Sequence, residues 1–258
     1  MPVQCLCGFI ESGLILENSI QVTGRIVGRK IDTVIFDLDG TLVDSQPAAL
    51  GATIEALSRY GVHVSEGDLR EQFGSGARKL LGYFLVRELG SDQAGKIIDD
   101  AVLMRNDLQL TFTDGVVLLP GVNQLLRLLR DSNYRLALAT MSARNVVEHV
   151  TTYHEINELF DVMMTADDVV NAKPDPEILT KTIDQLGAQV ECTLYIGDSS
   201  HDLEAALSMG MLFLLADTGI YVRGEMREKL RAAAERNGFP TVGLNELSNI
   251  PDIVMSTI

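Results

Sequence analysis

From residue 31 onward, the sequence alternates between short apolar runs and stretches with helical periodicity. The apolar runs are almost uninterrupted, which is typical of parallel strands that are buried on both faces. They occupy residues 32–37, 134–140, 161–166, 192–198 and 211–217. Helical patterns occupy residues 121–132, 143–153, 176–187 and 200–210. This alternation predicts an α/β fold in which helices cover both faces of a parallel sheet.

Residues 46–112 break the alternation, because no strand-like run occurs among them. Their segments all have helical patterns, which predicts a smaller helical cap inserted after the first strand. The predicted catalytic core then comprises residues 31–45 and 113–258. Residues 1–30 follow neither pattern and are expected to form an N-terminal extension of undetermined role.

The composition restricts the class of partner and the compartment. The 258 residues carry 21 basic and 36 acidic side chains, a net charge of -15, so a general basic surface for nucleic acid or anionic membranes is not expected. No apolar run approaches the roughly 18 to 20 residues that span a bilayer. Glu11 and Glu17 interrupt the apolar N-terminal stretch, which argues against a secretory signal. Three cysteines are too few for a disulfide framework, so we expect a cytoplasmic protein. The expected oligomeric state is a monomer or a homodimer.

Polar side chains follow three of the predicted strands directly: Asp37, Thr140 and Asp198. Ligands of open parallel sheets bind beyond the carboxyl ends of the strands, so these side chains converge if their strands are neighbours. Asp39 lies on the same side of an extended chain as Asp37. Asp202 shares one face of a helix start with Asp198. The sequence therefore predicts a cluster of up to four carboxylates at one edge of the sheet.

The carboxylates of such a cluster would repel one another or take up protons unless a cation offset their charge. A hard divalent cation with oxygen ligands does so, and Mg2+ is the expected ion. Lys173, in a loop before a helix, supplies a charge for a carboxylate and for a transferred phosphoryl group. Thr140 supplies a hydroxyl for a phosphoryl oxygen. Each feature alone is ordinary, a solvated acid or a surface lysine, so the prediction rests on their combined order and spacing.

The same segments resemble the motifs of the haloacid dehalogenase superfamily of phosphotransferases. The matching stretches are DLDGTLVDS, LALAT, AKPDPE and GDSSHD, and LLPGV is similar to the segment that re-enters the core after a helical cap. The resemblance covers about residues 31 to 250. It implies a Rossmann-like core with an inserted α-helical cap.

The resemblance also implies a role for each matched acid. Asp37 is the nucleophile that forms an aspartyl-phosphate, and Asp39 is first the general acid and then the base. Mg2+ is held by the Asp37 carboxylate, the Asp39 backbone carbonyl and Asp198. Asp202 lies close to the ion or acts on it through water.

By the same resemblance, Thr140 and Lys173 are catalytic residues that hold the phosphoryl oxygens. One position departs from the family pattern. The residue after Thr140 is Met141, where the phosphatase branch often has asparagine, and Ser142 follows it as a partial substitute. The departure concerns a substrate contact and leaves the nucleophile unaffected.

The stretch FGSGARKLLG, residues 73–82, resembles the cap specificity segment of phosphoglycolate phosphatase-like enzymes. Gly74 and Gly76 at a helix start would expose backbone N–H groups, and Arg78 or Lys79 would bind an acidic leaving group. A plain loop-to-helix transition with a solvated basic pair explains the stretch equally well. The expected partner is a small phosphorylated metabolite of the phosphoglycolate or sugar phosphate type.

The predicted function is that of an Mg2+-dependent phosphatase acting on a small phosphomonoester. A phosphomutase of the beta-phosphoglucomutase type would keep all four motifs, and a non-catalytic binding protein would keep the scaffold, so both are alternatives. Asp39 argues against a dehalogenase, which replaces the second aspartate of the first motif. Neither Lys79 nor Lys96 has the sequence context of a phosphonatase lysine.

Overall fold

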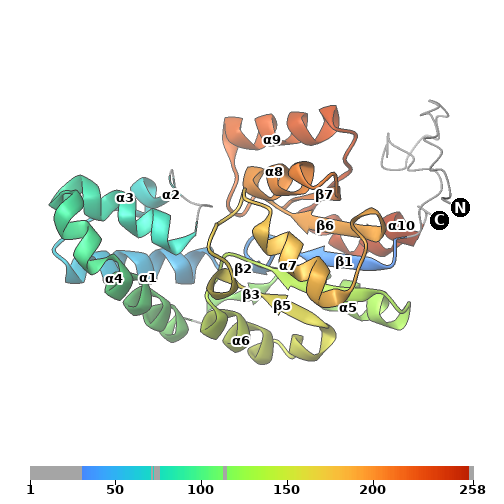
Figure 1. The fold of residues 1–258 in the computed structure, drawn as a ribbon, viewed down its shortest axis with the longest axis horizontal. Helices are drawn as coiled ribbons and strands as arrows, with labels where there is room; N and C mark the ends of the chain where they lie inside the picture. The colour runs from blue at the N-terminus through green and yellow to red at the C-terminus, as the bar shows by residue number, and fades with distance from the viewer. Residues whose placement is uncertain (1–30, 71, 73–75, 113–114, 256–258) are drawn as a thin grey trace, which may run out of the picture.

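The computed structural model describes residues 31–70, 72, 76–112 and 115–255 (Figure 1). Its core is a six-stranded parallel sheet in the order β5-β4-β1-β6-β7-β8. The strands are β1 (Thr33–Phe36), β4 (Arg135–Ala139), β5 (Val162–Met164), β6 (Thr193–Gly197), β7 (Leu212–Asp217) and β8 (Thr241–Gly243). The five predicted strands are present, and β8 is an additional strand at the sheet edge.

Two layers of helices cover the two faces of this sheet. They are α5 (Val122–Asp131), α6 (Arg144–Tyr153), α7 (Glu177–Leu186), α8 (Ser200–Ser208), α9 (Gly224–Arg236) and α10 (Ile250–Met255). Successive strand residues point to opposite faces, so Val34 and Phe36 of β1 enter one hydrophobic core and Ile35 enters the other. Helices α5, α6 and α10 complete the first core, and α7, α8 and α9 complete the second. The predicted α/β fold class is confirmed.

A helical cap with its own hydrophobic core lies between β1 and β4 in the chain. Its helices are α1 (Gln46–Arg59), α2 (Glu66–Arg70), α3 (Ala77–Leu89) and α4 (Ser91–Thr111). Leu81 and Phe84 of α3 are fully buried within this bundle. Where the chain leaves and re-enters the core, β2 (Val43–Asp44) pairs with β3 (Val117–Leu118) in a short antiparallel ladder. Figure 1 shows the cap beside the core, at the left of the view.

The sheet topology brings the ends of three strands together. β1 lies between β4 and β6, with Phe36 aligned to Leu138 on one side and to Ile196 on the other. The carboxyl ends of these strands therefore meet at one edge of the sheet, which faces the cap (Figure 1). An edge of this kind, beside a central strand with crossovers to both sides, is where open parallel sheets bind ligands.

Two predicted segments lie outside the described part of the chain. One is the N-terminal extension, residues 1–30, and the other is the start of the return to the core at residues 113 and 114. Among the helices that the structure does describe, none has both the length and the apolar character needed to cross a lipid bilayer.

Candidate active site

Three aspartates meet at the carboxyl edge of the sheet. Asp37 follows β1, and its N–H donates to the Ile196 carbonyl of β6 at 2.8 Å, which fixes the two strand ends against each other. Asp198 follows β6, and Asp202 lies in the first turn of α8. All three are buried, and one carboxylate oxygen of each lies within 4.8 Å of the others. The structure thus brings three of the four predicted carboxylates into one cluster.

Lys173 supplies the positive charge in this cluster. Its Nζ lies 2.8 Å from Asp37 Oδ1 and 2.9 Å from Asp202 Oδ1. The carbonyl of Ala139 and the hydroxyl of Tyr195, each at 2.6 Å, complete the oxygens around the ammonium. Burial lowers the pKa of Lys173, but the carboxylates of Asp202 and Asp37 reverse this effect, so its pKa is raised and the ammonium stays charged.

Glu177 anchors the loop that carries Lys173. Its carboxylate accepts hydrogen bonds from Lys181 Nζ at 2.7 Å, from the Asn171 N–H at 2.8 Å and from the Val170 N–H at 3.1 Å. These donors lower the pKa of Glu177 to about 2. The first residue of α7 therefore ties the loop to the helix that follows it.

Asp39 lies beside this cluster, where hydroxyl groups orient its carboxylate. Ser45 Oγ donates to one oxygen, and Ser142 Oγ donates to the other at 2.6 Å. Thr140 Oγ1 lies 3.3 Å from the same oxygen as Ser142 and accepts the Ser142 N–H at 3.1 Å. Thr140 therefore contacts the predicted general acid, and its contact with a phosphoryl oxygen stays a prediction.

The start of α8 positions Asp202 through a helix cap. Ser199 Oγ accepts the Asp202 N–H at 3.3 Å and donates to Asp202 Oδ2 at 2.5 Å. The other oxygen, Oδ1, accepts from Tyr195 and Lys173. Both carboxylate oxygens of Asp202 are thus occupied by protein donors. This arrangement suits a residue that holds the Lys173 and Tyr195 side chains in position. A direct ligand of a metal ion needs an oxygen that protein donors leave free.

Burial dominates the electrostatics of the cluster, because it disfavours the charged form of a carboxyl group. It raises the pKa of Asp37 to about 7, although the Lys173 ammonium lowers it. Burial also raises the pKa of Asp198 well above its ordinary value, and the charges of Asp202 and Asp37 add to this effect. For Asp202, the Lys173 ammonium and the hydrogen bond from Ser199 outweigh burial, so that pKa is lowered. Without a metal ion, Asp37 and Asp198 therefore take up protons more readily than ordinary aspartates do.

Two observations fit a hard cation at this cluster. Asp198 Oδ2 is buried and has no hydrogen-bond partner among the described residues, which leaves its lone pairs for a ligand. Gly40 lies against the same oxygen. A Cβ at Gly40 would collide with Asp198 Oδ2 and lie 2.6 Å from Tyr221 Cδ2, and the φ of +83° also favours glycine. Oxygen donors of this kind match the preference of Mg2+.

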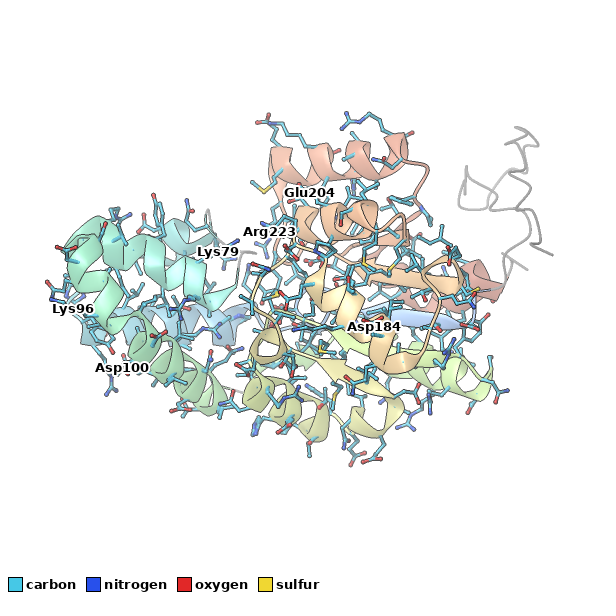
Figure 2. The ribbon with its side chains drawn as sticks, in the orientation of Figure 1. Lys79, Lys96, Asp100, Asp184, Glu204 and Arg223 are labelled. Carbon is cyan, nitrogen blue, oxygen red and sulfur yellow. The ribbon has the colours of Figure 1, made fainter. Side chains whose placement is uncertain are left out.

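The predicted substrate residue Arg78 lies on the exposed surface of the cap. Its Nη1 lies 2.5 Å from Asp99 Oδ1, so its guanidinium is already paired within the cap. Figure 2 shows Lys79 at the end of the cap nearer to the core, and Lys96 at the outer end. The role predicted for Arg78 stays a prediction.

The start of α3 contacts the core next to the second motif. A Cβ at Gly76 would lie 3.9 Å from Cβ of Met141, so this turn packs against the loop that follows Thr140. Gly74, also predicted to expose its N–H there, lies outside the described residues. Met141 thus occupies the boundary between the core and the cap.

Sequence reasoning missed several polar residues around the site. Ser45 Oγ, which binds Asp39, also lies 2.7 Å from the Tyr221 hydroxyl. Tyr195 is fully buried and its hydroxyl contacts Lys173 and Asp202. Its position within a continuous apolar strand gives only a packing signal. Arg105 of α4 is also buried, and the helical pattern gives no sign of this.

Comparisons with known proteins agree on the class, a haloacid dehalogenase-like hydrolase. The family described as haloacid dehalogenase-like hydrolase matches residues 34–216, which is more than half of the chain, so the protein belongs to that family. The match confirms the family resemblance and the hydrolase class predicted from the motifs.

Individual relatives extend this agreement. A pyrophosphatase named PpaX from Bacillus mycoides is 29% identical over 181 residues, which cover 70% of this chain and 81% of PpaX. CbbY from Rhodobacter sphaeroides, solved in complex with phosphate, has a TM-score of 0.71 at 23% identity, covering 85% of this chain and 96% of CbbY. A beta-phosphoglucomutase from Clostridium difficile has a TM-score of 0.73 at 20% identity, covering 88% and 97%. At these identities, the two solved structures show the shared fold alone.

Proposed function

We propose that the protein is an Mg2+-dependent phosphatase that hydrolyses a small phosphomonoester through an aspartyl-phosphate at Asp37. The observation that carries the proposal is the 2.8 Å contact between Lys173 Nζ and Asp37 Oδ1, in the same cluster as the buried Asp198 Oδ2, which has no hydrogen-bond partner in the described part of the chain. Asp37 lies between the Lys173 ammonium and an Asp198 oxygen that would bind Mg2+. Positive charge on both sides would let this carboxylate receive an anionic phosphoryl group. The name of PpaX, a pyrophosphatase, supports a phosphorylated substrate.

In the first half of the reaction, a carboxylate oxygen of Asp37 attacks the phosphorus of the ester. A P–O bond to Asp37 forms while the bond from phosphorus to the alcohol oxygen breaks. Asp39 gives its proton to that leaving oxygen. Because Ser45, Ser142 and Thr140 hold the Asp39 carboxyl group, its direction is set before the substrate binds.

In the second half, a water molecule attacks the phosphorus of the aspartyl-phosphate. Asp39 takes the proton of the water, and the P–O bond to Asp37 breaks, which releases inorganic phosphate. Asp37 is again a carboxylate and Asp39 is again protonated. Lys173 stays charged throughout and offsets the charge of the phosphoryl oxygens.

Asp37, Asp198 and the backbone carbonyl of Asp39 would hold Mg2+. When bound, the ion supplies Lewis-acid neutralisation of phosphoryl charge and of the repulsion between carboxylates. Asp198 offers Oδ2 for this purpose, and the missing side chain of Gly40 makes room for that oxygen. Asp202, whose oxygens are both hydrogen-bonded, holds Lys173 in place through their ion pair.

A phosphate-release assay with Mg2+ over a panel of small phosphomonoesters tests this proposal. We expect wild-type protein to release phosphate from at least one compound and Asp37→Asn to lose about 10³-fold or more in kcat/KM. EDTA should abolish turnover and added Mg2+ should restore it. The matched control is Asp184→Asn, an exposed aspartate on α7 in the core (Figure 2), which should keep wild-type turnover.

Two results would change the assignment. Wild-type turnover by Asp37→Asn would remove this residue as the nucleophile. Conversion of one phosphorylated isomer into another, with no net release of phosphate, would identify the alternative function of a phosphomutase. If no compound in the panel reacts, the alternative of a non-catalytic binding protein is favoured.

A further inference from the structure

Arg105 of helix α4 is a buried cation without an acidic partner. The residue is only 7% exposed, and its Nε–H donates to Thr53 Oγ1 at 3.4 Å. Its Nη1 donates to Asn106 Oδ1 at 3.2 Å. Across the described ranges, no carboxylate lies within ion-pair distance of its guanidinium. Because removing a guanidinium from water is costly, a buried arginine ordinarily pairs directly with an anion, and the described residues supply none at ion-pair distance.

The Arg105 guanidinium lies close enough to the catalytic end of the core to sense its charges. It interacts electrostatically with the carboxylate of Asp39 and with the side chain of Tyr221, across the boundary between cap and core. Burial lowers the pKa of Arg105 and these two groups oppose the shift, yet an arginine in a protein stays protonated. Asp39 is the residue proposed to protonate the leaving oxygen. This charge interaction therefore links Arg105 to the group proposed to act on the leaving oxygen.

The neighbours of Arg105 form a polar face of α4. Gln109 lies one helical turn further on, and its buried Oε1 has no hydrogen-bond partner among the described residues. Asn106, which accepts from Arg105, lines a cleft of about 380 Å³ between α4 and α6. On the core side, the cleft is lined by residues 143–145, directly after Ser142, which binds Asp39, and by the acidic residues Glu148 and Asp167. Arg105 and Asn106 therefore connect the Asp39 end of the site with an open cleft.

We propose that Arg105 is a specificity-determining residue that binds a second anionic group, a carboxylate or a second phosphoryl group, on the leaving group of the substrate. The proposal rests on the phosphatase function above and narrows its substrate to phosphomonoesters that carry another anion. A planar guanidinium matches either group with two parallel N–H donors. Arg78, which the sequence suggested for an acidic leaving group, is exposed and already paired with Asp99.

Two pairs of matched ligands isolate the second anion. Phosphoglycolate and hydroxyethyl phosphate differ by a carboxylate, and propanediol bisphosphate and hydroxypropyl phosphate differ by a phosphoryl group. Calorimetry with Mg2+ measures Kd for each ligand in the full-length variant Asp37→Asn, which blocks turnover, and in Asp37→Asn with Arg105→Gln. In Asp37→Asn, we expect the more anionic member of at least one pair to bind about 10- to 100-fold more tightly. Arg105→Gln should remove this preference, and the pair affected identifies the anion.

The matched control adds Arg59→Gln to Asp37→Asn, since Arg59 is an exposed cap arginine that pairs with Glu55. The preference should persist in this control. The proposal is overturned if Asp37→Asn shows no preference in either pair, a result that requires no Arg105 variant to fold. It is also overturned if the preference survives Arg105→Gln. Failure of the phosphatase function appears separately, as phosphate release by Asp37→Asn or as none by the wild-type protein.

Discussion

Gly40 keeps room beside the Asp198 carboxylate because it has no side chain. In Gly40→Ala, the added methyl group collides with Asp198 Oδ2 and with the Tyr221 ring, so one of these groups must move. Because the proposed ion depends on that oxygen, we expect kcat/KM to fall by about 100-fold or more. We also expect Mg2+ to be required at higher concentration. Phosphate release measured against Mg2+ concentration checks both effects.

Gly61→Ala is the matched control for this substitution. Gly61 also has a positive φ, +74°, but nothing lies within 4 Å of a Cβ placed there. The control should therefore cost only the left-handed backbone strain of about 1–2 kcal/mol in the free energy of unfolding. Turnover should stay at the wild-type level. Equal activity in the two variants would contradict the argument that the space beside Asp198 matters.

The serine that caps the N-terminus of helix α8 has a counterpart at helix α2 in the inserted helical domain. Ser199 binds Asp202 through the same two contacts that Ser65 makes with Asp68 at the start of α2, where Oγ lies 2.7 Å from Asp68 Oδ2. We expect Ser199→Ala and Ser65→Ala each to lower the free energy of unfolding by about 1 kcal/mol. Only Ser199→Ala should also lower kcat/KM, by about 10-fold, because Asp202 supports Lys173. Urea unfolding and phosphate release measure the two effects, and an equal loss of turnover in both variants would refute the link.

Glu177 joins α7 to the loop of Lys173, and its contribution to stability depends on pH. Its pKa is lowered from 4.5 to about 2, so the folded state binds fewer protons than the unfolded state between these values. The stabilisation is therefore fully present above pH 4.5 and is lost as the pH falls toward 2. We expect wild-type protein to exceed Glu177→Gln in the free energy of unfolding by a constant amount from about pH 5 to 8, with the difference shrinking in acid.

Urea unfolding at a series of pH values measures this difference. The matched control is Glu225→Gln at the start of α9, because Glu225 also pairs with a lysine four residues later, Lys229, at 2.8 Å on an exposed surface. A surface pair of this kind contributes little, so the control should change stability less than Glu177→Gln does. A Glu177→Gln difference that grows as the pH falls would contradict the assigned direction.

The architecture of the molecule was largely predictable because its central strands are buried on both faces and therefore have continuous apolar sequences. The edge strand β8, Thr241–Gly243, contains a single buried apolar residue, and each strand of the β2–β3 ladder has only two residues, so neither gives such a pattern. Because Asp37 and Asp198 each follow a strand, the sequence predicted them as neighbours on the condition that their strands are adjacent, and the observed order meets this condition by placing β1 next to β6. Residues that directly follow two adjacent parallel strands lie close together.

Residues from the cap and the outer loops were not predictable in this way. Arg105 lies on a helix whose orientation toward the core depends on how two separate hydrophobic cores meet, and local periodicity carries no information about that contact. A buried arginine also has the same sequence pattern as an arginine on the polar face of a helix. Tyr221 reaches Ser45 from a loop after β7, far along the chain. Such contacts emerge only from the assembled tertiary structure.

The central position of β1 has a consequence for the order in which the protein is made. The strand that leads into Asp37 pairs with β4, which begins at Arg135, and with β6, which begins at Thr193. A nascent chain therefore contains β1 for some time with neither neighbour available, while the cap helices, whose contacts are local, have already been synthesised. A polypeptide released by the ribosome before Thr193 would contain Asp37, the proposed nucleophile, but would lack Asp198 and Asp202, which surround it in the folded protein.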